Sequence, residues 1–266
     1  MNQATLFRPE WRWRELALCN AIAFGILGSW LWQPTRQLWE QLDHAVFNTL
    51  NSPLATHPLW AHIWAIGSMR PADAGAALVM LLFLIGRNLI FSGTQVRSAL
   101  FGFLSLLLLL TLFRVGLFSK VVDLMQWQHS SPSITVDGAV HLSTLFPDWE
   151  SKWHMKDSSN QSFPGDHGAV LLLWALFLWP FVRGLRRLVV IALLCLLMLP
   201  RLVAGAHWAS DVFVGGLFLS LVTLSWGLYS PYAARVTSLL ERWGALILDP
   251  LGRLPGLNRI SLFSKR

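Results

Sequence analysis

His207 and Asp211 stand four residues apart in the stretch AGAHWASD, a spacing that places two side chains on one face of a helix. A carboxylate in that position can fix the tautomer of an imidazole and stabilise its charged form, which leaves the other ring nitrogen free as a nucleophile or base. Arg201 lies six residues before His207, and Gly205 between them allows the chain to turn. A planar guanidinium suits bidentate binding of phosphate, so the pattern indicates phosphoryl chemistry.

A second polar stretch, SFPGDHG at residues 162–168, precedes a long apolar run. The first amides of a helix that begins there would attract an anion, which makes Ser162, Gly165 and Asp166 candidate contacts to a phosphate. His167 in the first turn is placed to protonate a departing oxygen. The alternative is an ordinary helix start, since Ser and Asp are common at the beginning of helices.

The composition is that of an all-α integral membrane protein. Hydrophobic residues make up 54% of the 266 residues and charged residues 13%, and the mean hydropathy is +0.50. A helix needs roughly 20 apolar residues to cross a membrane. Six segments meet that length, which predicts six transmembrane helices at about 15–33, 73–92, 97–118, 167–184, 187–206 and 211–229.

The distribution of the 21 Lys and Arg residues predicts the orientation of the six spans. Most of them fall in the segments that share a side with the N-terminus, so the positive-inside rule places both termini in the cytoplasm. We therefore expect a six-span domain at 1–230 and a basic, amphipathic cytoplasmic tail at 231–266. The net charge of +7 is explained by this topology, and no nucleic-acid partner is expected.

The first outer loop, about residues 34–72, contains two apolar segments too short to span. Leu38, Leu42, Val46 and Leu50 recur at helical spacing and predict an amphipathic helix at the outer interface. The stretch PLWAHIWAIGS that follows predicts a short re-entrant or interfacial piece.

The second outer loop, about residues 119–166, carries most of the polar residues outside the spans. Lys120, His129 and Lys156 are its candidate phosphate ligands, although a charged loop residue is more often only solvated. The eight histidines show no metal-ligand spacing, so neither a metal nor another cofactor is expected.

PGDH followed by RLVAGAHWASD resembles the second and third signatures of the type 2 phosphatidic acid phosphatase (PAP2) superfamily, which are P-S-G-H and S-R-x5-H-x3-D. The matching positions are Pro164, His167, Arg201, His207 and Asp211. The departures are Gly165, Asp166 and Pro200. The first signature, K-x6-R-P, does not occur, which is why Lys120, His129 ahead of Pro132, and Lys156 are considered in its place.

The resemblance implies a PAP2-like bundle with a periplasm-facing active site and a role for each matched residue. His207 would attack phosphorus to form a phosphohistidine, Asp211 would orient it, His167 would protonate the leaving group and Arg201 would bind phosphate. The mechanism that the superfamily uses needs no metal.

The stretch KDSSNQSFPGDHG, taken with PRLVAGAHWASD, looks like one branch of the superfamily, whose members move a phosphate from undecaprenyl pyrophosphate to lipid A at the inner membrane. We therefore expect a phosphotransferase whose partners are a polyprenyl diphosphate, lipid A-type lipids and the membrane itself. One alternative is a lipid phosphatase that uses water as acceptor. Another, of a different class, is a lipid transporter or binding protein that keeps the polar residues only to bind headgroups.

Asp166 raises a separate question, because a carboxylate beside an anion site should repel the substrate. It either stabilises the start of the helix or tunes the choice of acceptor.

Overall fold

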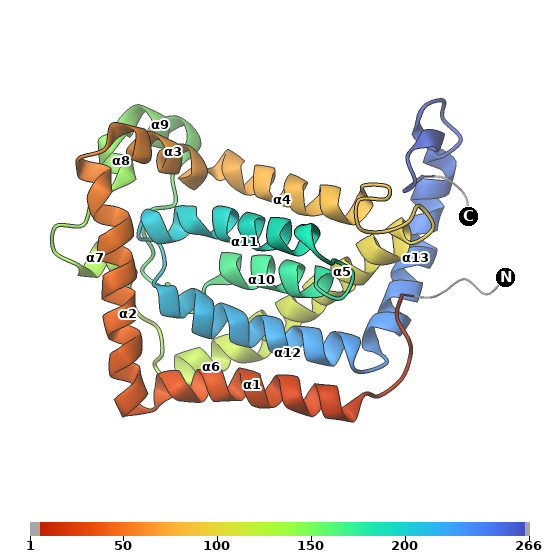
Figure 1. The fold of residues 1–266 in the computed structure, drawn as a ribbon, viewed down its shortest axis with the longest axis horizontal. Coiled ribbons are helices and arrows are strands. Elements are labelled where there is room, and N and C mark those ends of the chain that lie inside the picture. Colours follow the sequence, from red (N-terminus) through yellow and green to blue (C-terminus); the bar gives the residue numbers. More distant parts are fainter. Residues whose placement is uncertain (1–5, 264–266) are drawn as a thin grey trace.

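The computed structural model describes residues 6–263, and the regular elements in that range are helices (Figure 1). The longer ones are α1 (Trp13–Leu31), α2 (Gln33–Asn51), α3 (Pro58–Ser68), α4 (Arg70–Ile85), α5 (Val96–Thr111), α10 (Asp166–Leu178), α11 (Leu185–Val203), α12 (Leu217–Leu228) and α13 (Tyr232–Leu251). The shorter ones are η1 (Ser52–Ala55), η2 (Leu112–Phe118), α6 (Ser119–Leu124), α7 (Pro132–Thr135), α8 (Leu142–Leu145), α9 (Pro147–Trp153), η3 (Asp211–Gly216) and η4 (Leu257–Arg259). The prediction of an all-α protein is confirmed.

Each of the six predicted spans coincides with a helix, but the helices differ in length. Within residues 6–263, two are long and apolar enough to cross a membrane, Val96–Leu124 and Asp211–Leu228, and the bent pair formed by α1 and α2 makes a third if it counts as one span. At 13 residues, α10 extends about 20 Å, short of the roughly 30 Å hydrocarbon core. These helices indicate an integral membrane protein, whereas the number of six spans stays a prediction.

The chain turns by 85° at Trp32, between α1 and α2. The predicted amphipathic helix is therefore present as α2, but the face that it buries is not its leucine stripe. Leu38 and Leu42 are exposed, and the buried positions are Asp43, Phe47 and Asn51. We treat α2 as an interfacial helix outside the spans, because its many polar residues could not lie in hydrocarbon.

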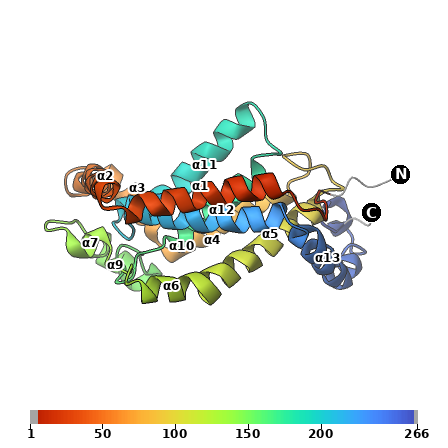
Figure 2. The same ribbon diagram turned by 90° about the horizontal axis from the view of Figure 1, so that it is seen from below.

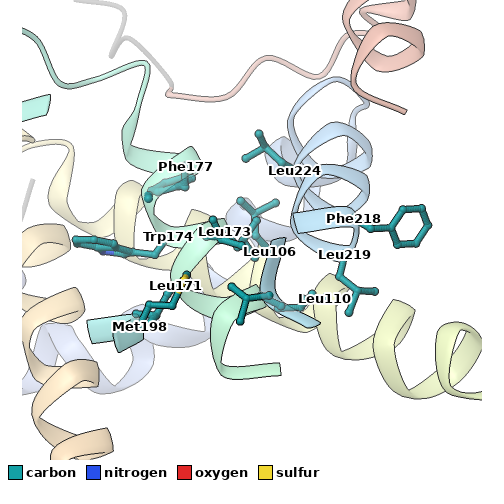
Figure 3. Packing of buried hydrophobic residues seen from close by; sticks show 14 of the residues in the cluster. Leu106, Leu110, Leu171, Leu173, Trp174, Phe177, Met198, Phe218, Leu219 and Leu224 are labelled. Carbon is teal, nitrogen blue, oxygen red and sulfur yellow. The ribbon is translucent and has the colours of Figure 1, made fainter. Parts of the chain in front are cut away.

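The core is built around α10, which is apolar on all sides and is enclosed by α5, α11, α12 and η3 (Figure 3). Trp174 and Leu173 on this helix are fully buried. Small residues allow the backbones to approach closely. A Cβ at Gly168 would lie 2.8 Å from Cγ1 of Val212, and one at Gly216 would lie 3.1 Å from the amide nitrogen of Ala169. This packing fixes the start of α10 against η3.

The elements at the two ends of the bundle are different (Figures 1 and 2). At one end lie α2, α3 and the short helices α7 to α9, together with the end of α11 and the start of α10. At the other end lie the first turn of α1 and α13. The polar stretches of the sequence therefore gather at one end, away from the first turn of α1 and from α13.

The predicted tail at 231–266 is docked on the bundle rather than separate from it. Helix α13 packs against α5, where Tyr232 Oη donates a hydrogen bond to the Ser105 carbonyl at 2.9 Å. Arg97 forms an ion pair with Asp249 at 2.7 Å. Residues 1–5 and 264–266 of the two predicted segments lie outside the described range, and the boundary near 230 stays a prediction.

Candidate active site

A tight turn after α11 brings Arg201 and His207 to the same place. Gly205 has φ +75°, and the amides of Ala206 and His207 both donate to the Arg201 carbonyl, at 2.9 and 3.3 Å. A Cβ on Gly205 would lie 2.7 Å from Cε2 of Phe47 on α2. Glycine is thus required twice at this turn, by its conformation and by the neighbouring ring.

His207 is held by two oxygen atoms on the same ring nitrogen. Its Nδ1 lies 2.9 Å from the Ser162 carbonyl and 3.5 Å from Oδ2 of Asp211. A carbonyl and a carboxylate only accept hydrogen bonds, so Nδ1 carries the proton and Nε2 keeps its lone pair. The geometry gives the imidazole the tautomer that a nucleophile requires.

The carboxylate of Asp211 is completely buried and both of its oxygens are bonded. Oδ1 lies 2.8 Å from Nε2 of His129, and Oδ2 accepts from the Trp208 amide at 2.8 Å. The main-chain oxygen of Asp211 accepts from the Gly165 amide at 2.9 Å. Asp211 therefore joins the turn that carries His207 to the start of α10.

One cavity of about 310 Å³ collects the polar side chains of this end of the bundle. Its walls include three basic residues, Arg70, Lys156 and Arg201, and the imidazoles of His167 and His207. The remaining lining residues are Asp73, Ser159, Gln161, Pro164 and Asp166. Several cations around two imidazoles suit the binding of a phosphate or diphosphate group.

Arg201 is 5% exposed, and three acceptors hold its guanidinium. Nη1 donates to the carbonyls of Ser68 and Lys156 at 3.3 and 3.4 Å, and Nη2 donates to the carboxylate of Asp73. Nδ1 of His167 lies 3.9 Å from the same carboxylate. Asp73 therefore faces both the expected phosphate ligand and the expected acid.

Most of the site residues expected from the sequence come together. His167, His207, Arg201, Asp166 and Lys156 line the cavity, with Asp211 directly behind His207. Their roles stay predictions. No group of three or more His, Cys, Asp or Glu side chains within residues 6–263 is arranged to hold a metal ion.

Four expected phosphate contacts are placed elsewhere. Ser162 is buried, and its hydroxyl and amide both donate to the carbonyl of His129. The Gly165 amide is occupied by the Asp211 carbonyl, so it is not free for an anion. Lys120 is exposed on α6 and does not line the cavity, and His129 faces Asp211 instead of the cavity. The donors of Ser162 and Gly165 are thus used within the protein, and a contact of either residue with phosphate stays a prediction.

Sequence reasoning missed Asp73, Arg70, Asp43 and Arg114. Arg114 on η2 forms an ion pair with Asp166, and Asp43 on α2 accepts from the amide and the hydroxyl of Ser210, next to Asp211. A signal was present for Arg114, since an arginine inside an apolar run is costly unless it has a partner. Asp43 gave no comparable signal, because its helix also carries Arg36 and Glu40.

A model of the PAP2 superfamily matches residues 132–235, which include the turn, the start of α10 and the cavity residues on them. The lipid A 1-diphosphate synthase of Escherichia coli strain K12 is 25% identical over 249 residues, which cover 92% of this chain and 95% of that protein. No solved structure matches the chain significantly. Phosphatases and phosphotransferases make up the superfamily, so these matches favour an enzyme over the lipid transporter or binding protein that the sequence left open.

Residues 132–235 of this chain match the PAP2 superfamily, and the protein is an enzyme of the phosphatase and phosphotransferase type.

Proposed function

We propose that this enzyme takes the terminal phosphate from a polyprenyl diphosphate such as undecaprenyl pyrophosphate and passes it to lipid A. The observation that carries the proposal is the arrangement of His207. Its Nδ1 is occupied by Ser162 and Asp211, and its ring lines a cavity with three basic side chains. Nε2 is then the atom left to attack phosphorus.

The first step forms a bond between Nε2 of His207 and the terminal phosphorus and breaks the bond to the bridging oxygen. Polyprenyl phosphate leaves, and His167 supplies the proton to that oxygen if one is needed. Arg201, Arg70 and Lys156 balance the charge on the phosphoryl oxygens. Asp211 stabilises the positive charge that the imidazole acquires.

In the second step a phosphate oxygen of lipid A attacks the phosphohistidine, the nitrogen–phosphorus bond breaks and the free imidazole returns. The name of the Escherichia coli relative and its match along 92% of this chain support lipid A as acceptor. Water is the second candidate, since the matched superfamily includes phosphatases.

An apolar groove beside the cavity supports a lipid substrate. It encloses about 220 Å³ between α3, α4 and α11 and shares Asp73, His167 and Arg201 with the polar cavity. Its remaining walls are mainly apolar, among them Ile63, Ile66, Leu196, Leu197 and Pro200. A diphosphate in the polar cavity could thus keep its hydrocarbon chain in apolar surroundings.

An assay with undecaprenyl pyrophosphate labelled in the terminal phosphate tests both candidates. The purified enzyme is given the donor with and without lipid A, and label is measured in lipid A, in free phosphate and on the protein. Transfer to lipid A supports the phosphotransferase, whereas release of phosphate that lipid A does not change supports the phosphatase. His207→Gln should abolish the labelled protein, and His57→Gln on the exposed loop before α3 is the control.

The proposed topology has six spans, both termini in the cytoplasm of a bacterial cell and the active site at the periplasmic face of its inner membrane. It is supported by the location of the cavity at the end of the bundle opposite α13. In a variant with serine at Cys19 and Cys195, a single cysteine is placed at Lys152 on α9 or at Arg253 after α13. A membrane-impermeant thiol reagent should label the first in intact spheroplasts, and the second only after lysis. The reverse pattern would invert the topology.

A further inference from the structure

Asp211 lies between two imidazole rings, and the nucleophile is only one of them. Oδ1 of Asp211 is 2.8 Å from Nε2 of His129, and Oδ2 is 3.5 Å from Nδ1 of His207. The third PAP2 signature, which contains the partnership of His207 with Asp211, has no second histidine. The additional ring comes from the loop after α6, 82 residues before Asp211.

Both ring nitrogens of His129 face atoms that only accept hydrogen bonds. Nε2 faces the carboxylate of Asp211, and Nδ1 lies 3.2 Å from the Trp127 carbonyl. A neutral imidazole has one N–H and would leave a lone pair directed at one of these oxygens, whereas an imidazolium donates to both. The contacts are therefore best satisfied by a positively charged His129.

His129 does not line the 310 Å³ cavity, which argues against a direct contact with the phosphate. It lines a separate cavity of about 350 Å³, whose other lining residues include four from α2. The ionisable groups on α2 that border this cavity are Arg36, Glu40, Asp43 and His44. Arg36 is paired with Glu40 at 3.0 Å and Asp43 is bonded to Ser210, so the carboxylate of Asp211 is the acidic group in hydrogen-bond contact with His129.

We propose that His129 is a positioning residue. As an imidazolium it holds the carboxylate of Asp211, so that a His129–Asp211–His207 arrangement orients the nucleophile. The inference rests on the proposed function, because it concerns how the same phosphohistidine forms. The bond from His129 fixes one carboxylate oxygen, and the Trp208 amide fixes the other. The Asp211 side chain is thereby locked in the rotamer that faces His207.

The charge on His129 also sets how strongly Asp211 attracts the proton on Nδ1 of His207. A carboxylate that is already balanced by an imidazolium attracts that proton less, so the phosphorylated ring leaves as a neutral imidazole rather than as a more basic, imidazolate-like group. The charge on His129 thus favours transfer of the phosphoryl group onward, whereas the fixed position of the Asp211 side chain favours formation of the phosphohistidine. It does not contribute to binding of the donor.

Three variants test this role. His129→Phe removes the hydrogen bond and the charge, His129→Gln keeps a donor without the charge, and His57→Phe controls for the loss of a histidine elsewhere. A misoriented group can cost about 100-fold in rate. We expect kcat of His129→Phe to fall by about that factor while KM for undecaprenyl pyrophosphate changes less than twofold, and His129→Gln to recover about tenfold of the loss.

Two measurements distinguish a failure of this inference from a failure of the proposed function. Rapid quenching of the enzyme with labelled donor measures how fast the phosphoprotein forms, and the thermal midpoint of each variant shows whether it is folded. If His129→Phe is unstable, the comparison between His129→Gln and the native enzyme decides. A native enzyme that never acquires label would refute the proposed function. If the native enzyme does acquire label, His129 variants that keep the native kcat, or that change only in KM, would refute the inference.

Discussion

Arg114 binds both carboxylate oxygens of Asp166, from Nε to Oδ1 at 2.5 Å and from Nη2 to Oδ2 at 3.3 Å. Asp166 lines the polar cavity of about 310 Å³ at the first turn of α10, and Arg114 belongs to η2, 52 residues earlier in the chain. An acidic side chain beside an anion site is thus balanced by a cation from a neighbouring helix. The ion pair accounts for two features of the sequence, namely the departure from the PAP2 signature at Asp166 and the presence of Arg114 inside an apolar run.

The ion pair between Arg114 and Asp166 predicts how removal of the arginine changes KM for the donor. Arg114→Gln leaves the carboxylate of Asp166 unpaired and facing the phosphate, so KM for the polyprenyl diphosphate should rise about fivefold, as expected for two like charges a few ångströms apart near water. The double variant Arg114→Gln/Asp166→Gly should return KM close to the native value. Steady-state kinetics of the two single variants and the double variant measure the coupling.

Asp166→Gly alone addresses the choice of acceptor. If the carboxylate tunes that choice, the ratio of label in lipid A to free phosphate should change when the family glycine is restored. An unchanged ratio would leave Asp166 only a role at the start of α10, where an acidic side chain is favourable.

The local part of the site could be predicted from the sequence because it depends on spacing within single elements. His207 and Asp211 are four residues apart, and Arg201 and His167 lie at the ends of apolar runs that end on the same side of the bundle. The apolar runs also located the six helices. Two of these helices are shorter than their apolar runs, because α4 ends at Ile85 and α10 at Leu178, where the predicted spans reached 92 and 184.

The partners of these residues could not be predicted, because they come from distant helices. Asp73 is 128 residues from Arg201, and Asp43 is 167 residues from Ser210. Which carboxylate meets which partner is decided by how helices pack, and one sequence carries no record of that. On α2 the leucine stripe that includes Leu38 was evident from the sequence, but the burial of Asp43 against the turn was not.

The three acceptors around Arg201 predict that lysine cannot replace it. The guanidinium satisfies Asp73 and the carbonyls of Ser68 and Lys156 together, which a single ammonium group cannot do from one position. Arg201→Lys should therefore keep the fold but raise KM for the diphosphate donor about tenfold or more. Donor binding by the inactive His207→Gln protein, with and without Arg201→Lys, checks this without turnover. Equal affinity would show that Arg201 supports the turn and not the phosphate.

Asp43 predicts a dependence of stability on pH that is independent of catalysis. Burial raises the pKa of its carboxyl from 3.8 to about 6, against the opposing effect of the hydrogen bonds from Ser210. A carboxyl with a raised pKa in the folded state binds its proton more tightly there, so the folded protein loses stability as the pH rises from about 4 to about 6. The expected loss is about 3 kcal/mol in the free energy of unfolding.

Asp43→Asn removes the ionisable group but keeps an oxygen that can accept from the Ser210 amide. The thermal midpoint of the native protein relative to this variant should fall between pH 4 and pH 6.5 and stay constant above that range. Differential scanning fluorimetry in detergent measures both proteins at each pH. Parallel curves through the whole interval would mean that Asp43 titrates normally.

Gly205 predicts how much of the site depends on the turn after α11. Its φ of +75° and the predicted contact of a Cβ with Phe47 at 2.7 Å and with Ser133 at 3.0 Å both oppose a side chain. Gly138 has φ +77° with nothing within 4 Å of its Cβ, so Gly138→Ala carries only the conformational cost of about 1 kcal/mol. Gly205→Ala should cost clearly more and lower kcat by at least about tenfold, because Arg201 and His207 move apart. Equal midpoints and activities for the two variants would show that the turn tolerates rearrangement without loss of the site.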